Sequence, residues 1–257
     1  MKAHNIHVDQ AKCIGCGLCR SDCPVNNILV TNKKAEIISQ DCIKCGHCVA
    51  ICPKAAVSMT GFDEPPKEIE GPASLDAKQL LEAIRNRRSI RRFTDQKVDP
   101  VVIRQIIEAG RLTPTGGNAQ NVSYVVLTKE IGKYEKTAVR MFRKMMPLAK
   151  KIMPSARNMT IDDHFFFKKA PAVILVVSKD QLNGALAASN MELMARACGL
   201  GVLYSGFFSM ASNLSPTLRK AFGLRGGKKV VTALVLGYPG VKYFRTAQKE
   251  RAEVRVL

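Results

Sequence analysis

The feature that most constrains this chain is a cysteine pattern that occurs twice near its N-terminus. The segments "CIGCGLCRSDCP", from residue 13, and "CIKCGHCVAICP", from residue 42, share the spacing Cys-x-x-Cys-x-x-Cys-x-x-x-Cys-Pro. These two blocks contain eight of the nine cysteines of the 257-residue chain. An internal repeat of this kind predicts two equivalent halves related by an approximate two-fold axis.

The spacing predicts two 4Fe–4S clusters that share ligands between the halves. Three thiolates three residues apart on a tight loop can wrap three corners of a cubane, while the fourth cysteine reaches the other cluster. The predicted ligands of the first cluster are Cys13, Cys16, Cys19 and Cys52. Those of the second are Cys42, Cys45, Cys48 and Cys23. Gly15, Gly17 and Gly46 suit loops whose backbone must approach sulfide closely.

Zinc and disulfide bonds are the alternative uses of these cysteines. Zinc sites usually take two pairs of ligands separated by a longer gap. A disulfide framework needs an oxidising compartment, and "MKAHNIHVDQAKC" at the N-terminus contains no apolar export segment. We therefore expect a cytoplasmic protein that binds iron–sulfur clusters. Residues 5–60 resemble the bacterial two-cluster ferredoxins, and the resemblance implies a module that transfers single electrons.

The net charge of +19 at first indicates a nucleic-acid-binding protein, but its distribution argues against one. Residues 1–60 carry seven Lys or Arg against four Asp or Glu, a net of +3, so +16 lies in the remainder. Only "RRSIRR" (87–92) is dense, and no long basic stripe forms. A basic enzyme surface that attracts anionic cofactors or acidic redox proteins fits this distribution. No apolar run reaches the roughly 20 residues of a membrane span.

The rest of the chain predicts a linker and then an α+β domain. Residues 58–74 are rich in proline and acids and lack hydrophobic periodicity. We therefore divide the chain into a ferredoxin domain (1–60), a linker (61–74) and a larger domain (75–257). Helices are predicted within 75–89, within 98–111 between an Asp99 cap and Gly110, and within 182–201, ending at Gly199. Buried strands are predicted at 122–128, 172–178 and 229–237, giving one sheet between helical layers.

No glycine-rich dinucleotide or phosphate loop is present, so another element must bind any phosphate. "RRSIRRF" (87–93) places several guanidiniums and one hydroxyl at the junction of a helix and a turn, and arginine matches phosphate oxygens bidentately. A solvated charge run is the alternative. The order of "RRSIRRF", "TPTGGNAQN", "AASNMELMARACGLG", "YSGF" and "GYPGVKYFR" resembles the FMN-dependent nitroreductase family over residues 75–250.

The resemblance implies a nitroreductase-like mixed sheet flanked by helices, in a homodimer with FMN at the interface. Matching positions assign the FMN phosphate and ribityl chain to Arg87, Arg88, Ser89 and Arg91, with Lys242 and Arg245 closing over the phosphate. The partner subunit's loop would frame the ring through Pro114, Thr115, Gly116 and Asn118, with Gln120 close by. Backbone groups of Ser205 and Gly206 would approach the ring. The chain departs from the family at Thr115, Gly116 and Ser205, which bears on substrate contacts.

No side-chain nucleophile or acid–base dyad stands out, in keeping with chemistry carried out by flavin. His4, His7, His47 and His164 are scattered and are interpreted as surface or structural residues, and Cys198 as a buried small residue. The Met- and Phe-rich segment 141–169 lies where the family carries a variable insertion. It is either a lid over flat substrates or a pair of packed helices.

Together these observations predict a cytoplasmic FMN oxidoreductase with a built-in two-cluster ferredoxin. Electrons from the clusters, or from NAD(P)H as the resemblance also admits, would reduce a small nitroaromatic, quinone or enone. The alternative is an FMN and iron–sulfur electron-transfer protein that serves an acidic redox carrier without small-molecule catalysis. Neither nucleic acid nor membrane is an expected partner.

Overall fold

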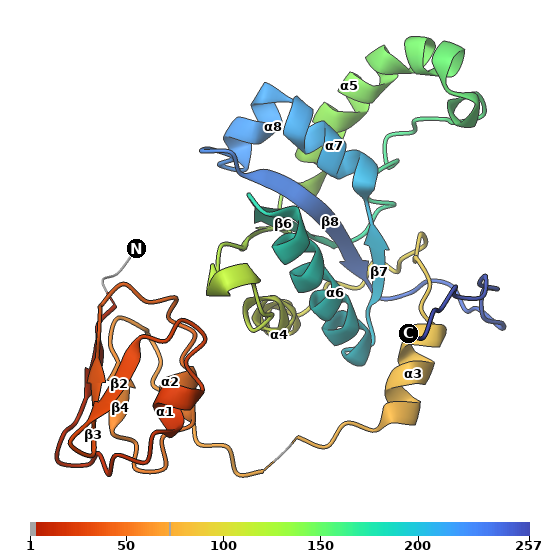
Figure 1. Cartoon of the computed structure of the whole chain (residues 1–257). Coiled ribbons are helices and arrows are strands. Elements are labelled where there is room, and N and C mark those ends of the chain that lie inside the picture. The colour runs from red at the N-terminus through yellow and green to blue at the C-terminus, as the bar shows by residue number, and fades with distance from the viewer. Residues whose placement is uncertain (1–3, 72) are drawn as a thin grey trace. The chain divides into compact units, whose positions relative to one another are not determined.

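The computed structural model describes residues 4–71 and 73–257, which form two compact units (Figure 1). The first unit comprises the chain up to Ser74 together with Gly116–Ala119. The second comprises Leu75–Thr115 and Gln120–Leu257.

The first unit repeats one strand–loop–helix–strand arrangement. The first half contains β1 (Ile6–Val8), α1 (Leu18–Ser21) and β2 (Ile28–Thr31), and the second contains β3 (Lys34–Ile37), α2 (His47–Ala50) and β4 (Val57–Met59). β1 pairs with β4, and β2 pairs with β3, both antiparallel. Each short helix follows a left-handed glycine, Gly17 at φ 80° and Gly46 at φ 77°. The internal repeat of the sequence is therefore a repeat of structure, at an offset of 29 residues.

The second unit is built on a four-stranded sheet. Its elements are α3 (Ala77–Arg85), α4 (Pro100–Arg111), β5 (Ser123–Leu127), α5 (Ile131–Ile152), the 3₁₀ turn η2 (Pro154–Ala156), β6 (Ala172–Ser178), α6 (Gln181–Ala197), β7 (Gly201–Tyr204), α7 (Gly206–Leu214), α8 (Pro216–Ala221) and β8 (Lys229–Gly237). A further 3₁₀ turn, η1 (Gly116–Asn118), belongs to the first unit. The strand order is β5-β6-β8-β7.

The three predicted strands are confirmed as β5, β6 and β8, whereas β7 was not predicted. The prediction of a mixed sheet needs correction, because β5–β6, β6–β8 and β7–β8 all pair antiparallel. A parallel element enters only through an isolated bridge between Ser89 and Val202. β4 also takes in Ser58 and Met59, at the start of the segment interpreted as a linker.

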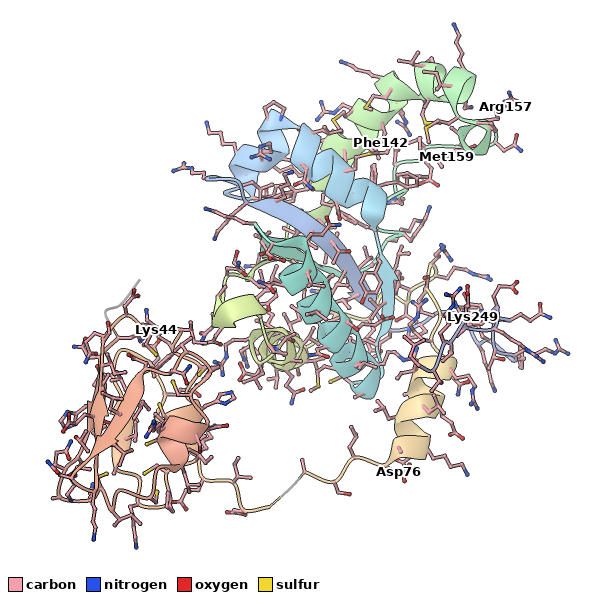
Figure 2. All side chains as sticks on the ribbon, viewed as in Figure 1. Lys44, Asp76, Phe142, Arg157, Met159 and Lys249 are labelled. Carbon is pink, nitrogen blue, oxygen red and sulfur yellow. The ribbon has the colours of Figure 1, made fainter. Side chains whose placement is uncertain are left out.

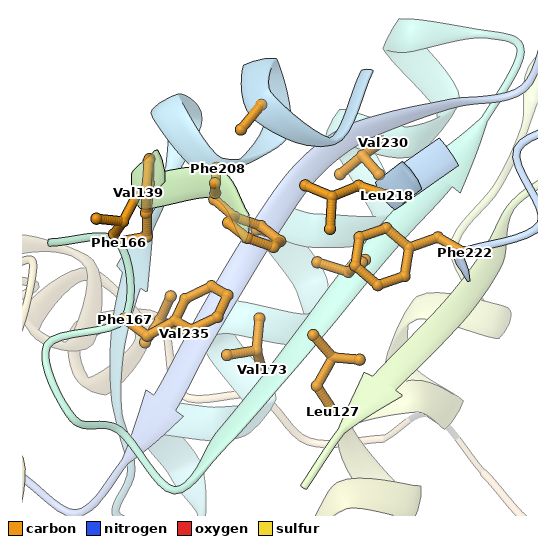
Figure 3. Packing of buried hydrophobic residues seen from close by; sticks show 14 of the residues in the cluster. Leu127, Val139, Phe166, Phe167, Val173, Phe208, Leu218, Phe222, Val230 and Val235 are labelled. Atoms are coloured by element: carbon orange, nitrogen blue, oxygen red, sulfur yellow. The ribbon is translucent and has the colours of Figure 1, made fainter. Parts of the chain in front are cut away.

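The sheet lies between two hydrophobic clusters because its residues alternate between faces. Val173 and Leu175 of β6 belong to the first cluster, which α5, α7 and α8 cover; Ile174 and Val176 belong to the second, which α4 and α6 cover. Figure 3 shows the first cluster, in which Phe166, Phe167 and Phe208 pack against strand residues such as Val173 and Val235. The prediction of one sheet between helical layers is confirmed (Figure 1).

The helix ends follow the predicted caps with one exception. Asp99 caps α4 by accepting a hydrogen bond from the Val101 amide, and Gly199, at φ +76°, lies just beyond the end of α6. Asp76, labelled in Figure 2, caps α3 in the same way as Asp99. Gly110 lies one residue before the end of α4 at Arg111, so the predicted end is correct to within one residue, but the glycine does not cap the helix. A Cβ there would meet the Tyr124 hydroxyl at 2.6 Å and the Met191 sulfur at 2.8 Å.

Segment 141–169 packs against the protein at its two ends, whereas Leu148, Ile152 and Met153 in its middle are 64%, 68% and 54% exposed. It comprises the end of α5, η2 and the loop that leads to β6, near the labels Phe142, Arg157 and Met159 in Figure 2. Phe166 and Phe167 are fully buried, as the packing interpretation requires, and Phe165 and Met146 are partly buried against the same cluster. Met145 is 44% exposed. Cys198 also differs from expectation, since it is only half-buried.

A buried carboxylate holds this segment in place. Glu135 of α5 is 2% exposed and accepts hydrogen bonds from the amides of Phe166 (3.0 Å) and Phe167 (2.7 Å). His164 lies 3.6 Å from its other oxygen. Burial raises the pKa of Glu135, whereas the two amides and His164 act in the opposite direction.

We expect the substitution Glu135→Ala to lower the free energy of unfolding by about 3 kcal/mol, because two buried amides lose their acceptor. Glu135→Gln retains an acceptor oxygen and should cost about 1 kcal/mol. Urea unfolding followed by circular dichroism measures both. Glu130→Ala is the matched control, since this residue, directly before α5, forms an exposed pair with Lys133 of that helix, and should change stability by less than about 0.5 kcal/mol. Equal losses for Glu135→Ala and Glu130→Ala would contradict this role.

Candidate functional site

The eight clustered cysteines of the first unit line two separate cavities. Cys13, Cys16, Cys19 and Cys52 line the first cavity. Cys23, Cys42, Cys45 and Cys48 line the second. Each cavity thus combines three cysteines of one block with the fourth cysteine of the other. This is the grouping that the spacing predicts for two shared clusters.

Backbone amides point at sulfur in both cavities. In the first, the amides of Ala35 and Ala56 donate to the sulfurs of Cys13 (3.3 Å) and Cys52 (3.2 Å). In the second, the amides of Lys44 and Asn27 donate to Cys42 and Cys23, both at 3.3 Å. Such N–H···S bonds stabilise sulfur that carries negative charge, as it does when it binds metal.

The first loop also depends on glycine at one position. Gly15 lies at φ +67°, and a Cβ there would overlap the carbonyl of Lys33. No other residue fits at this close approach, because both the left-handed backbone and the missing side chain are needed.

Burial makes two thiols of these cavities harder to ionise, one in each cavity, whereas for Cys52 the effect of burial is outweighed by backbone amides, which lower its pKa. Burial raises the pKa of Cys48 to about 11, and the neighbouring Cys45 adds to the rise. Burial also raises the pKa of Cys19. A metal centre reverses this effect because its positive charge keeps bound thiolates ionised. The soft thiolate donors and the apolar, amide-lined walls therefore fit an iron–sulfur cluster.

Within residues 4–71 and 73–257, no three His, Cys, Asp or Glu side chains converge as the ligands of a single ion would. The eight clustered cysteines surround two volumes, four to each.

The second unit presents a cationic segment along the edge of its sheet. Residues 87–93 lie beside β7, where Ser89 forms a parallel bridge with Val202 and the Ile90 amide donates to the Val202 carbonyl at 3.0 Å. Ile90 packs directly on Gly201, where a Cβ would meet its side chain at 2.5 Å. Arg87, Arg88 and Ser89 are half-buried, whereas Arg91 is exposed.

The C-terminal segment pairs with the other side of the same stretch. Phe93 forms an antiparallel bridge with Pro239, and the Gly240 amide donates to the Arg92 carbonyl at 2.9 Å. Arg88 donates to the Arg245 carbonyl at 3.0 Å, and its guanidinium lies 5.6 Å from the Tyr243 ring centre. Lys242 and Arg245 therefore both lie in the C-terminal segment that contacts Arg88.

Glu192 is a member of this site that the sequence did not single out. Its side chain, 11% exposed, lies on α6 with one oxygen 3.3 Å from the Arg87 guanidinium. Burial and the nearby Glu192 raise the pKa of Tyr204, whose hydroxyl donates to the Ala188 carbonyl. Glu192 thus orients Arg87 and partly balances its charge. A single acid in a long helix carries no pattern that would reveal this pairing.

The N-terminus of α7 lies at the end of β7. Ser205 is buried, and its side chain makes no capping hydrogen bond. The first amides of a helix have no partner within the helix and favour negative charge in front of them. Backbone donors are thus available at Gly206, next to Ser205. The family resemblance implies that the backbone groups of these two residues approach the flavin ring.

Residues of the predicted "TPTGGNAQN" loop fall in both units. In the second unit, the Gln120 amide donates to the Thr115 hydroxyl at 3.0 Å, and Pro114 is exposed. Gly116 and Asn118 belong to the first unit, where the Asn118 amide group donates to the carbonyls of Ile43 (3.0 Å) and Lys44 (2.8 Å).

Residues 84–238 match the Nitroreductase family, which is more than half of the chain. The chain belongs to this family. Residues 5–53 match a 4Fe-4S dicluster domain, so the protein joins a ferredoxin-type domain to a nitroreductase-family domain. Among the described residues, no helix has the length and apolar composition that crossing a bilayer requires.

Curated relatives match the nitroreductase part. A "Putative NADH dehydrogenase/NAD(P)H nitroreductase" of Archaeoglobus fulgidus is 25% identical over 172 residues, which cover 63% of this chain and 86% of that protein. A "Putative NAD(P)H nitroreductase YfhC" of Bacillus subtilis is 25% identical over 174 residues, covering 62% and 84%.

Solved structures share the fold. A nitroreductase with bound FMN from Bacteroides fragilis gives a TM-score of 0.56 at 20% identity, over 69% of this chain and 98% of that one. A BluB-like flavoprotein from Clostridium difficile gives 0.56 at 19% identity, over 68% and 99%.

We expect Gly201→Ala to displace residues 87–93 from β7, because the new methyl group would overlap Ile90. Overpacking of this kind costs about 1–3 kcal/mol of unfolding free energy. Gly132→Ala is the matched control, because a Cβ at Gly132, in the first turn of α5, meets nothing within 4 Å. That variant should be neutral or slightly stabilising. Urea unfolding compares the two, and equal stability would contradict the tight packing of Ile90.

Proposed function

We propose that this nitroreductase-family protein is a cytoplasmic iron–sulfur flavoprotein oxidoreductase that delivers electrons through FMN to a small nitroaromatic, quinone or enone-like acceptor. Two 4Fe–4S clusters, or NAD(P)H, serve as the source of electrons. The proposal rests on one observation. A single chain of this family contains both two four-cysteine cavities and a guanidinium-rich segment fixed on the edge of the sheet. When bound, the clusters supply single electrons and FMN supplies electron pairs or hydride.

The residues of the second unit fit a flavin mononucleotide because its phosphate is a dianion. Arg87, Arg88, Ser89 and Arg91 offer guanidinium and hydroxyl donors from one segment, and Lys242 and Arg245 add charge from the C-terminal segment. The pairing of Arg88 with the Arg245 carbonyl fixes one guanidinium before any ligand arrives. Preorganised donors of this kind bind phosphate more tightly than freely moving ones.

The backbone of Ser205 and Gly206 would support the ring. Amides at the start of α7 favour negative charge, which reduction of a flavin increases. We further propose that Pro114, Thr115, Gly116, Asn118 and Gln120 act on the FMN of a partner subunit.

A homodimer is supported by apolar side chains that one copy leaves exposed. On α7, Phe207, Met210 and Leu214 are 45%, 41% and 57% exposed at helical spacing. On α3, Leu81 and Ile84 are 54% and 51% exposed. Exposed apolar side chains at helical spacing, as on α7, are typical of a surface that another protein covers.

Cofactor analysis of anaerobically purified protein tests the proposal. We expect about eight iron and eight sulfide ions and about one FMN per chain. NAD(P)H or reduced ferredoxin should then support many turnovers with added nitro or quinone compounds. Exchange of electrons only with protein carriers would instead favour the electron-transfer alternative. Absence of acid-labile sulfide would contradict the iron–sulfur assignment.

We expect Arg88→Gln to weaken FMN binding about 10- to 100-fold, because a charge-assisted hydrogen bond to phosphate contributes about 1.5–3 kcal/mol. Fluorescence of free FMN during equilibrium dialysis measures the dissociation constant. Arg104→Gln, an exposed change on α4, is the control and should leave the constant unchanged. Equal affinity of the two variants would exclude Arg88 from the phosphate site.

A further inference from the structure

The two cysteine cavities are built by a repeat, but their charges differ at several repeat-related positions, and at one of them, Lys34, the ammonium is held by two backbone carbonyls. Lys34 begins β3, beside the first cavity. Its ammonium donates to the carbonyls of Gln10 at 2.6 Å and of Cys13 at 2.7 Å. At the repeat offset of 29 residues, Asn5 occupies the corresponding place before β1. A cation in one half therefore has a neutral counterpart in the other.

Lys34 belongs to a short stretch that forms one wall of the first cysteine loop. The amide of the next residue, Ala35, donates to the Cys13 sulfur, and the carbonyl of Lys33 lies where a Cβ of Gly15 would be. The Lys34 side chain is half-buried, so water screens its charge only in part. The ammonium is thus fixed beside the backbone of the loop that carries Cys13, Cys16 and Cys19.

At the position of Lys34 the second half has uncharged contacts, and the cation in its cysteine loop, Lys44, reaches Cys42 through its backbone amide. The counterpart of Ala35 is Ile6, whose amide donates to the Gln40 side chain at 3.0 Å instead of to a cysteine. The Gln40 side-chain amide in turn donates to the Ile6 carbonyl at 3.2 Å. Around the second cavity, His47 lies 3.2 Å from Asp22, which directly precedes Cys23. Lys54, by contrast, lines the first cavity.

We propose that Lys34 raises the reduction potential of the cluster held by Cys13, Cys16, Cys19 and Cys52 above that of the cluster held by Cys23, Cys42, Cys45 and Cys48. Each reduction adds one electron from an external donor, with no bond made or broken, and so adds one negative charge. A fixed ammonium nearby stabilises that charge. The two clusters then fill in a fixed order, the Cys13 cluster first. This inference rests on the proposed presence of two clusters.

Anaerobic redox potentiometry of the full-length holoprotein, followed by electron paramagnetic resonance, tests the assignment. The wild-type protein should show two one-electron steps at different potentials. Lys34→Gln should lower the higher step by about tenfold in its equilibrium constant, which is about 59 mV, and leave the lower step unchanged. Lys34→Arg retains the charge and should keep the wild-type potentials. Lys33→Gln removes an adjacent but exposed charge and should shift neither step by as much.

The reverse substitution gives an independent measurement. Asn5→Lys adds a cation at the repeat-related position and should raise the lower step, bringing the two potentials together. If Lys34→Gln fails to retain iron, the Asn5→Lys measurement alone tests whether a cation at this position raises the reduction potential of the neighbouring cluster. Unchanged steps in both variants, equal shifts of both steps, or a shift of the lower step in Lys34→Gln would overturn the proposal. Fewer than about eight iron ions in wild-type protein would instead contradict the proposed function, before any potential is measured.

Discussion

The structure of the N-terminal unit depends on bringing four thiolates together in each of two small cavities. Without metal this arrangement is unfavourable, because burial raises the pKa of Cys48 to about 11 and the charges of neighbouring thiolates repel. The chain offsets part of the cost with amide donors to Cys13, Cys23, Cys42 and Cys52. In the proposed clusters, iron cations would supply the remainder. The strands of this unit are only three or four residues long, so we infer that the clusters stabilise the fold as well as carry electrons.

The second unit also brings like charges together, but here the charges are positive. Guanidiniums crowded into residues 87–92 repel one another unless an anion is present. The backbone of this segment is fixed on both sides, by Val202 of β7 and by Pro239 and Gly240, so the side chains cannot simply move apart. Glu192 balances Arg87 from α6. A dianionic phosphate would balance the rest, which is why a flavin mononucleotide fits the segment better than an uncharged ligand.

Much of this arrangement follows from sequence because it rests on local rules. The cysteine spacing determines which four side chains share a cavity, and β6 and β8 are predictable as continuous apolar runs. β7 was not predicted because its four residues, which directly follow Gly199 and Leu200, are too few to show the apolar pattern of a strand. Gly110 marks the end of α4 to within one residue, but its role was not predicted, since tertiary packing against Tyr124 and Met191, and not helix capping, accounts for a glycine there. Glu192 and Lys34 act through partners distant in sequence, so no local pattern indicates them.

In the proposed function, electrons held by the clusters pass to FMN within one protein. Flash reduction of the clusters by a photochemical one-electron donor, without NAD(P)H, tests it through the decay of oxidised-flavin absorbance. We expect a flavin reduction rate that is independent of protein concentration, because the transfer is internal. A rate that rises in proportion to protein concentration, or clusters that stay reduced beside oxidised flavin, would contradict it.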